Sequence, residues 1–155
     1  MDKTRREEQF FADYLYRELP ISRAMQVRVD RVAPVCVSLS APLEANRNDK
    51  HTGFGGCLAS LLFMAGWGWL FNTLRRTGVE ADIVIQDGEL SFRKPTLDPL
   101  TAHCTGPGAG ELELFLDKLR LKSVARLELS AFVGEADAPN VILNGRFVAR
   151  LETPT

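Results

Sequence analysis

The sequence predicts an α+β fold in which one mostly antiparallel sheet wraps around a single long apolar helix. A chain of 155 residues with 45% hydrophobic residues can bury one substantial core, and we expect a single domain over residues 1–155. The stretch at 57–71, CLASLLFMAGWGWLF, is apolar on nearly every side, which is typical of a helix enclosed on most sides. Segments of alternating apolar and polar residues on either side of it predict several strands. A sheet curved around the helix is the economical way to cover a helix without a polar face.

The region before the apolar helix is expected to hold a helix and two strands. Apolar residues at helical spacing, followed by Pro20, predict an amphipathic opening helix that ends near Glu18. Its start, TRRE at 4–7, has the spacing of a capping box. Alternation at 27–30 and 35–40 predicts two short strands.

Residues 41–52, APLEANRNDKHT, are polar without a period and predict a loop that leads through glycines into the apolar helix. Gly78, just past two arginines, is a plausible end signal for that helix. Alternation over 81–92, with Asp87-Gly88 inside it, predicts one long bent strand or a hairpin. The polar segment 134–140 is expected to be a loop. The other elements expected are a strand, a short helix and two further strands, at residues 100–105, 112–119, 124–133 and 141–151.

Charge and composition argue against several classes of partner. The 19 basic and 20 acidic residues are spread along the chain and leave a net charge of -1, so no basic stripe predicts nucleic-acid binding. The apolar stretch is shorter than the roughly 20 residues that cross a bilayer, and no apolar run of signal-peptide type follows the charged N-terminus. We therefore expect a cytoplasmic protein without a membrane or nucleic-acid partner.

The chain shows no pattern that predicts a cofactor or a metal. The three cysteines, Cys36, Cys57 and Cys104, are an odd number without CxxC spacing, which indicates reduced thiols and no disulfide framework or zinc site. His51 and His103 lack ligand spacing to cysteines or carboxylates, and no glycine-rich phosphate loop is present.

The segment 42–57, PLEANRNDKHTGFGGC, and the later AGWG at 65–68 resemble the thioesterase domain that occurs alone or fused behind acetyltransferase domains, a member of the hotdog superfamily. The resemblance extends over nearly the whole chain and includes FRKP at 92–95 and GRF at 145–147. It implies a hotdog fold and a homodimer with a continuous sheet, or a dimer of dimers. It also implies sites between subunits near the start of the central helix, which would hydrolyse an acyl thioester such as an acyl-CoA or an acyl carrier.

The resemblance also implies three catalytic residues. Many hotdog thioesterases carry an asparagine or aspartate six residues before a His-Gly-Gly that opens the helix, and Asn48 here lies six before Phe54-Gly55-Gly56. Unpaired N–H groups of Gly56 and its neighbour Gly55 can hold the thioester oxygen as it becomes negative. Asn48 would orient the carbonyl or the attacking water. The alternative is that the glycines only let the helix start under a sheet and that Asn48 caps a turn.

Five further residues are candidates for substrate binding. Asn46 and Thr52 share the loop, so that one could cap the helix and the other contact substrate. Phe54 replaces the histidine of the relatives and can pack on an acyl chain or a dimer partner, but it cannot transfer a proton. Cys57 at the helix start is either a nucleophile with a lowered pKa or a small side chain in the first turn. Trp67 either lines the acyl slot or belongs to the core.

The sequence departs from its relatives in the catalytic base. The relatives often carry a carboxylate at the positions of Met64 and Ala65, and no Asp or Glu occurs between Gly53 and Gly78. A base would have to come from elsewhere. The candidates are Asp49, His51, Asp82 and Asp87. The alternatives to a hydrolase are a non-catalytic acyl-CoA or fatty-acyl binding module and a partner domain of an acetyltransferase.

Two other groups of residues are open to a binding role. Gly66 and Gly68 inside the helix cost roughly 1 kcal/mol each relative to alanine, which predicts close packing of a sheet or an acyl chain against them. Basic side chains near the loop and at a strand end are possible partners for the phosphates of CoA. They are Arg47, Lys50, Arg93 and Lys94.

Overall fold

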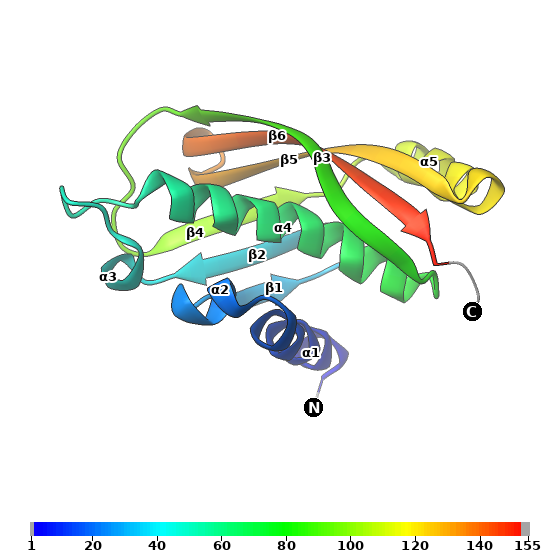
Figure 1. The fold of residues 1–155 in the computed structure, drawn as a ribbon, viewed down its shortest axis with the longest axis horizontal. Helices are drawn as coiled ribbons and strands as arrows, with labels where there is room; N and C mark the ends of the chain where they lie inside the picture. Colours follow the sequence, from blue (N-terminus) through cyan, green and yellow to red (C-terminus); the bar gives the residue numbers. More distant parts are fainter. Residues whose placement is uncertain (1, 153–155) are drawn as a thin grey trace.

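The computed structural model describes residues 2–152 and contains one six-stranded antiparallel sheet in the order β1-β2-β4-β5-β6-β3 (Figure 1). The helices are α1 (Lys3–Glu18), α2 (Pro20–Ala24), α3 (Leu43–Asn46), α4 (Gly55–Arg76) and α5 (Ala109–Lys122). The strands are β1 (Arg28–Val32), β2 (Cys36–Ala41), β3 (Ala81–Phe92), β4 (Leu100–Thr105), β5 (Val124–Glu135) and β6 (Ala138–Leu151). The expected antiparallel sheet around one long helix is confirmed.

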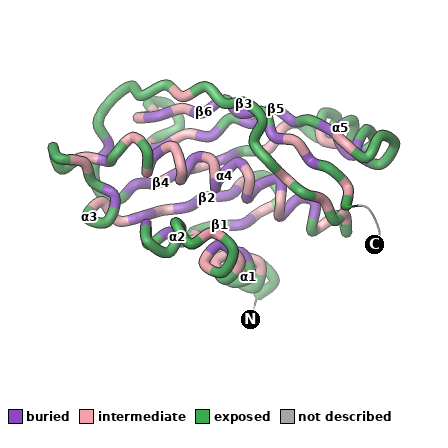
Figure 2. Tube along the Cα trace, in the orientation of Figure 1, coloured by how far each residue is buried: buried purple, intermediate pink, exposed green. Residues whose placement is uncertain are grey.

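The core lies between α4 and the inner face of the sheet. Side chains alternate along the strands, so that Val37 and Leu39 of β2 are buried while Ser38 between them is not. Leu61 and Leu62 of α4 are completely buried. Figure 2 shows that the buried residues are concentrated along α4 and the strands behind it. Of the most apolar stretch of α4, which is long enough to cross a membrane, 67% is buried inside the fold. This is the arrangement of a core helix in a soluble-type protein.

The two glycines inside α4 are explained by aromatic rings of the protein. A Cβ on Gly66 would lie 2.6 Å from Cζ of Phe147 on β6, and a Cβ on Gly68 would lie 2.4 Å from Cζ of Phe11 on α1. Both rings are almost completely buried. The sheet and α1 therefore approach α4 closely at these positions, as the sheet-packing interpretation predicted.

The ends of several elements differ from the sequence predictions. The prediction of a capping box at 4–7 is wrong. Asp2 is the N-cap of α1, and no side chain among residues 2–152 caps that end. The predicted loop 134–140 is a tight hairpin in which Glu135 pairs with Ala138. Gly134, with a φ of +95°, lets the chain turn there, and Pro139 fits because the ladder is irregular beside it. The loop 41–52 contains the short helix α3, and α2 follows directly after α1.

β3 forms one edge of the sheet. It is a single bent strand with an irregularity between Ile85 and Asp87, which confirms the bent-strand alternative over the hairpin. Its only strand neighbour in the described chain is β6, so the backbone of its other edge is unpaired. Because β3 runs back along α4, Phe92 at its end lies beside Gly55 at the start of α4.

Gly68→Ala is expected to lower the free energy of unfolding by about 1–3 kcal/mol, because the new methyl group overlaps the ring of Phe11. Urea denaturation measures the change. Gly110→Ala in α5 is the matched control, since no atom lies within 4 Å of its added Cβ, and it should be neutral or stabilise by about 0.4–1 kcal/mol. Equal effects of the two substitutions would contradict the close approach of α1.

Candidate active site

The start of α4 presents unpaired backbone donors. The N-cap residue is Phe54, whose side chain has no acceptor, and no side chain in the described chain caps this end. The first intrahelical bond runs from the N–H of Leu58 to the Phe54 carbonyl at 3.0 Å. The N–H groups of Gly55, Gly56 and Cys57 therefore have no hydrogen-bond partner within residues 2–152. Unpaired donors of this kind, together with the dipole of a 22-residue helix, favour negative charge near this end.

Two phenylalanine rings lie beside these donors. A Cβ on Gly56 would lie 2.6 Å from Cε1 of Phe54, and a Cβ on Gly55 would lie 3.5 Å from Cε1 of Phe92. Both rings are 53% exposed, so they offer apolar surface next to the donors. A side chain at position 56 would require the exposed ring of Phe54 to move away from the donors. The sequence analysis missed Phe92 as a site residue, although its place at a strand end before two basic residues was a usable signal.

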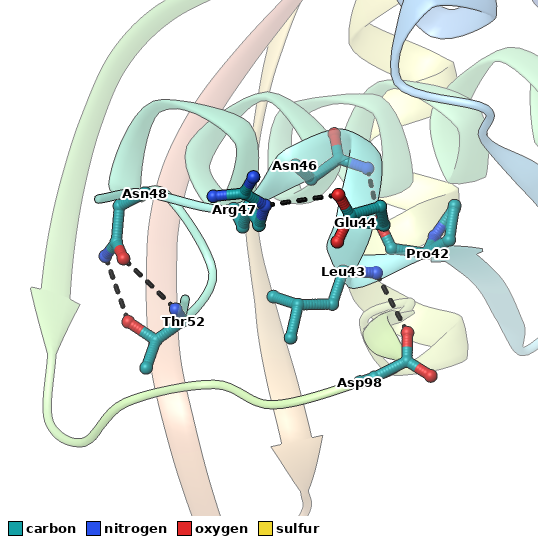
Figure 3. A network of polar contacts seen from close by, with 8 residues as sticks. All are labelled: Pro42, Leu43, Glu44, Asn46, Arg47, Asn48, Thr52 and Asp98. Atoms are coloured by element: carbon teal, nitrogen blue, oxygen red, sulfur yellow. Dashed lines mark hydrogen bonds and ion pairs between the residues drawn. The ribbon is translucent and has the colours of Figure 1, made fainter. Parts of the chain in front are cut away.

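The side chain of Asn48 holds the loop that precedes α4 (Figure 3). Its Oδ1 accepts the N–H groups of Lys50 at 2.9 Å and Thr52 at 3.1 Å, and its Nδ2 donates to Oγ1 of Thr52 at 2.9 Å. A bridge between Arg47 and Gly53 closes the same loop. One hydrogen of the Asn48 amide remains available for another acceptor. Asn48 therefore caps the turn, as the alternative interpretation predicted. Its amide also keeps one N–H that is not used in the turn.

Asn46 anchors the loop from inside the protein. It is 1% exposed, and its Nδ2 donates to the carbonyls of Met25 and Pro42, each at 2.8 Å. Its backbone carbonyl accepts the N–H of Phe54 at 2.8 Å. The expectation that Asn46 or Thr52 caps the helix with its side chain is wrong, because Thr52 is bonded to Asn48 and Asn46 points to α3 and the chain after α2.

Trp67 lies far from the loop within one chain. It follows Gly56 by eleven residues, which corresponds to about 16 Å along α4. Its Nε1 donates to the carbonyl of Ile83 at 3.2 Å, which fixes the ring against β3. Two cavities meet at this ring. One, of about 250 Å³, is lined by Leu19, Phe63, Met64, Trp67, Ile85 and Phe147. The other, of about 610 Å³, includes Tyr14, Trp67, Phe71, Arg75, Glu80 and Glu152.

The segments beside the two ends of α4 differ in charge. At its start, a hollow of about 340 Å³ is lined by Gly53, Gly55, Phe92, Arg93 and Lys94, among others. At its far end, Glu80, Asp82 and Glu152 line the larger cavity with Arg75 as the basic residue in that lining. A negatively charged group is therefore favoured near the start of α4 and disfavoured near its end.

The comparison with known families decides what kind of protein carries this site. Residues 8–151 match the family described as "Putative thioesterase (yiiD_Cterm)". The chain belongs to this thioesterase family. The match covers both the loop that leads into α4 and the whole sheet, so the resemblance found from the sequence is confirmed.

Solved structures share the fold of this chain. A protein of unknown function from Chlorobaculum tepidum TLS has a TM-score of 0.86 at 29% identity, covering 96% of this chain and 94% of that one. A protein from Shewanella oneidensis described as a putative thioesterase has a TM-score of 0.84 at 21% identity, and the match covers 94% of this chain and 98% of that one. The Escherichia coli PaaI protein has a TM-score of 0.63 at 14% identity, and the match covers 97% of this chain and 96% of that one. The expected hotdog fold is confirmed.

The thiol of Cys57 does not have the properties of a thioesterase nucleophile. Partial burial raises its pKa above the usual value, so the neutral thiol dominates at neutral pH. This shift is opposite to the lowered pKa that the nucleophile hypothesis requires, because burial disfavours the thiolate. Among the candidate bases, Asp49 and His51 are exposed on the loop, whereas Asp87 accepts the N–H of Gly88 at 2.8 Å.

Alkylation of Cys57 in a Cys36→Ser background is expected to be slower at neutral pH than that of a free cysteine, and to increase as the pH rises past its raised pKa. Cys104 does not interfere, because it is completely buried and because burial, the main cause of its raised pKa, does not depend on the replaced Cys36. Mass spectrometry of the labelled peptide over a pH series measures the rate. Fast labelling at neutral pH would restore the nucleophile hypothesis.

Proposed function

We propose that this thioesterase hydrolyses an acyl thioester whose carbonyl oxygen is held at the start of α4. The observation that carries the proposal is the set of unpaired N–H groups at Gly55, Gly56 and Cys57. Gly56 is the first donor, and the N–H of Gly55 or Cys57 is the second. The free amide hydrogen of Asn48 orients the carbonyl or the water from the loop. Donors of this kind stabilise charge most effectively when they are already in place before reaction.

In the reaction, the oxygen of water forms a bond to the carbonyl carbon, and the negative charge moves to the carbonyl oxygen held by the α4 donors. The carbonyl re-forms when the carbon–sulfur bond breaks. The thiolate that leaves takes up the proton released by water, and the products are a carboxylic acid and a thiol. A base that accepts the proton of water first would accelerate the attack.

Whether the protein has such a base decides between a hydrolase and a second candidate function. α4 carries no carboxylate, and the two candidate bases in the loop, Asp49 and His51, are exposed. The missing α4 carboxylate favours a non-catalytic acyl-CoA binding module as the second candidate. Both functions use the same donors and the same ligand, so thiol release distinguishes them.

We further infer that the thiol end of the substrate is coenzyme A. Its phosphates would lie toward Arg93 and Lys94, which are exposed beside the start of α4. The carboxylates at the far end of α4 would repel the same phosphates. This orientation directs the acyl group away from the basic hollow.

We also propose that two copies pair through β3 to form a homodimer, or the unit of a dimer of dimers. β3 is twelve residues long and has an edge that pairs with no strand among residues 2–152, while its Ile83 carbonyl accepts the indole N–H of Trp67. Glu80 and Asp82 lie at its first end, and Arg93 and Lys94 follow its last residue. Antiparallel pairing of two such strands brings the acidic end of one against the basic end of the other. The start of α4 in one subunit would then lie toward the Trp67 cavities of its partner.

Asn48→Asp is expected to lower kcat/KM for an acyl-CoA by about 10²–10³, because it keeps the acceptor for the two loop N–H groups but removes the amide donor. Release of CoA is followed with a chromogenic thiol reagent, corrected for the three cysteines. Glu44→Gln, an exposed change on the neighbouring α3, is the control and should keep wild-type turnover.

Three other outcomes bear on this proposal. Full activity of Asn48→Asp would exclude the amide donor as the group that Asn48 contributes, and would agree with the aspartate that many hotdog thioesterases carry at this position. No turnover by the wild type on any acyl-CoA, together with ligand-induced thermal stabilisation, would favour the binding module. A loss of thermal stability in Asn48→Asp would show that the loop bonds had not been preserved, and Asn48→Ser would replace it.

Mixing Asn48→Ala subunits with Trp67→Ala subunits tests whether a site contains residues of both chains. Random exchange of two weakened homodimers should restore about a quarter of the wild-type sites, because half of the dimers are mixed and each has one intact combination. Activity is measured before and after reversible dissociation. If all residues of a site belong to one chain, mixing restores nothing.

A further inference from the structure

The smaller cavity beside Trp67 has the composition of a hydrocarbon-binding pocket. Its six lining residues are Leu19, Phe63, Met64, Trp67, Ile85 and Phe147. They come from the end of α1, from α4, from β3 and from β6, so the cavity is a recess between elements and not a flat face. The indole N–H of Trp67 is the strongest donor among these side chains, and it is already bonded to the carbonyl of Ile83. The lining side chains therefore offer no conventional free donor or acceptor to a ligand.

The size of this cavity limits what can enter. An apolar cavity of roughly 150 Å³ accommodates a benzene molecule, and this one is about 250 Å³. Its floor is rigid, because Phe147 is 1% exposed and its ring is packed under Gly66. A phenyl group with a short linker, or a straight chain of medium length, fits such a space. A hydroxyl group on the tail would be buried without a partner, at a cost of roughly 1–3 kcal/mol.

The region beyond Trp67 rejects a charged tail. There the larger cavity is lined by Glu80, Asp82 and Glu152, and its Arg75 has its guanidinium 3.6 Å from the centroid of the Phe10 ring. A carboxylate at the far end of an acyl chain would meet three like charges. Neither cavity thus offers a favourable site for a tail that ends in an acid.

We propose that the cavity lined by Phe63, Met64, Trp67 and Ile85 binds the acyl tail, and that it selects acyl thioesters with an uncharged, unsubstituted hydrocarbon tail. The inference rests on the proposed function and on the proposed homodimer, in which this cavity faces the start of α4 of the partner subunit, and it names the substrate class of that site. Trp67 separates the apolar cavity from the acidic one. The tail pocket ends where the acidic cavity begins.

The kinetic test replaces a cavity-lining residue of β3 with a larger one, whose side chain should fill the pocket. Ile85→Trp should lower the ratio of kcat/KM for octanoyl-CoA to that for acetyl-CoA by at least about tenfold, since roughly 1.4 kcal/mol of lost tail binding corresponds to that factor. Val84→Trp is the matched control, because Val84 is the preceding residue on β3, is 59% exposed and does not line the cavity. The control should leave the ratio unchanged. The wild type should prefer octanoyl-CoA over its ω-hydroxy analogue by a similar factor.

A binding test does not depend on turnover. A fatty acid brominated near its end should quench the fluorescence of wild-type protein, and Trp67→Phe should remove most of that quenching, because the other tryptophan, Trp69, is 2% exposed and lines neither cavity. An excess of the unbrominated acid should restore the fluorescence. Quenching that persists in Trp67→Phe would place the tail elsewhere and overturn the pocket.

The two proposals fail in different ways. Turnover with an octanoyl-to-acetyl ratio that Ile85→Trp and Val84→Trp change equally would overturn the tail pocket and leave the hydrolase. Quenching that is lost in Trp67→Phe, without turnover on any acyl-CoA, would support the pocket and overturn the hydrolase.

Discussion

The burial of α4 is the constraint on which the other elements depend. A helix that is apolar on nearly every side cannot lie on the surface of a sheet, because half of it would remain in contact with water. The sheet curves around it, α1 covers a further side, and glycines in α4 allow rings to approach from both. A helix enclosed in this way has its position and direction determined by packing on several sides, which keeps its first turn in a defined place.

That rigidity makes the start of α4 suitable for chemistry. Helices usually begin with Ser, Thr, Asp or Asn, whose side chain bonds a first-turn N–H and contributes about 1 kcal/mol. Phe54 provides no such bond, and its neighbours are two glycines. The local stability lost at this end is offset by the packing of the remaining helix, and the donors stay available to a ligand. The loop supports the arrangement from the other side, because Asn48 and Asn46 bind its backbone at several points.

The length of α4 and the charges near its two ends would determine how a ligand is oriented. Gly56 and Trp67 lie about 16 Å apart along α4, so the residues implied by the family do not form a single cluster within a subunit. The exposed edge of β3 and the opposite charges at its two ends support a partner that would bring the halves together. The same charge gradient favours an anionic group at the start of α4 and an uncharged one near Trp67.

The sequence by itself determined the central helix, the strands and the loop with its glycines, because these depend on local periodicity and on turn residues. The family resemblance also implied Gly55 and Gly56 as donors, whereas only the structure showed that no described side chain caps this helix start. Tertiary structure decided which rings flank the donors: Phe92 is near Gly55 only because β3 runs back along α4. The raised pKa of Cys57 and the buried role of Asn46 also required the fold. Burial depends on contacts between segments far apart in the chain, and no local pattern encodes those contacts.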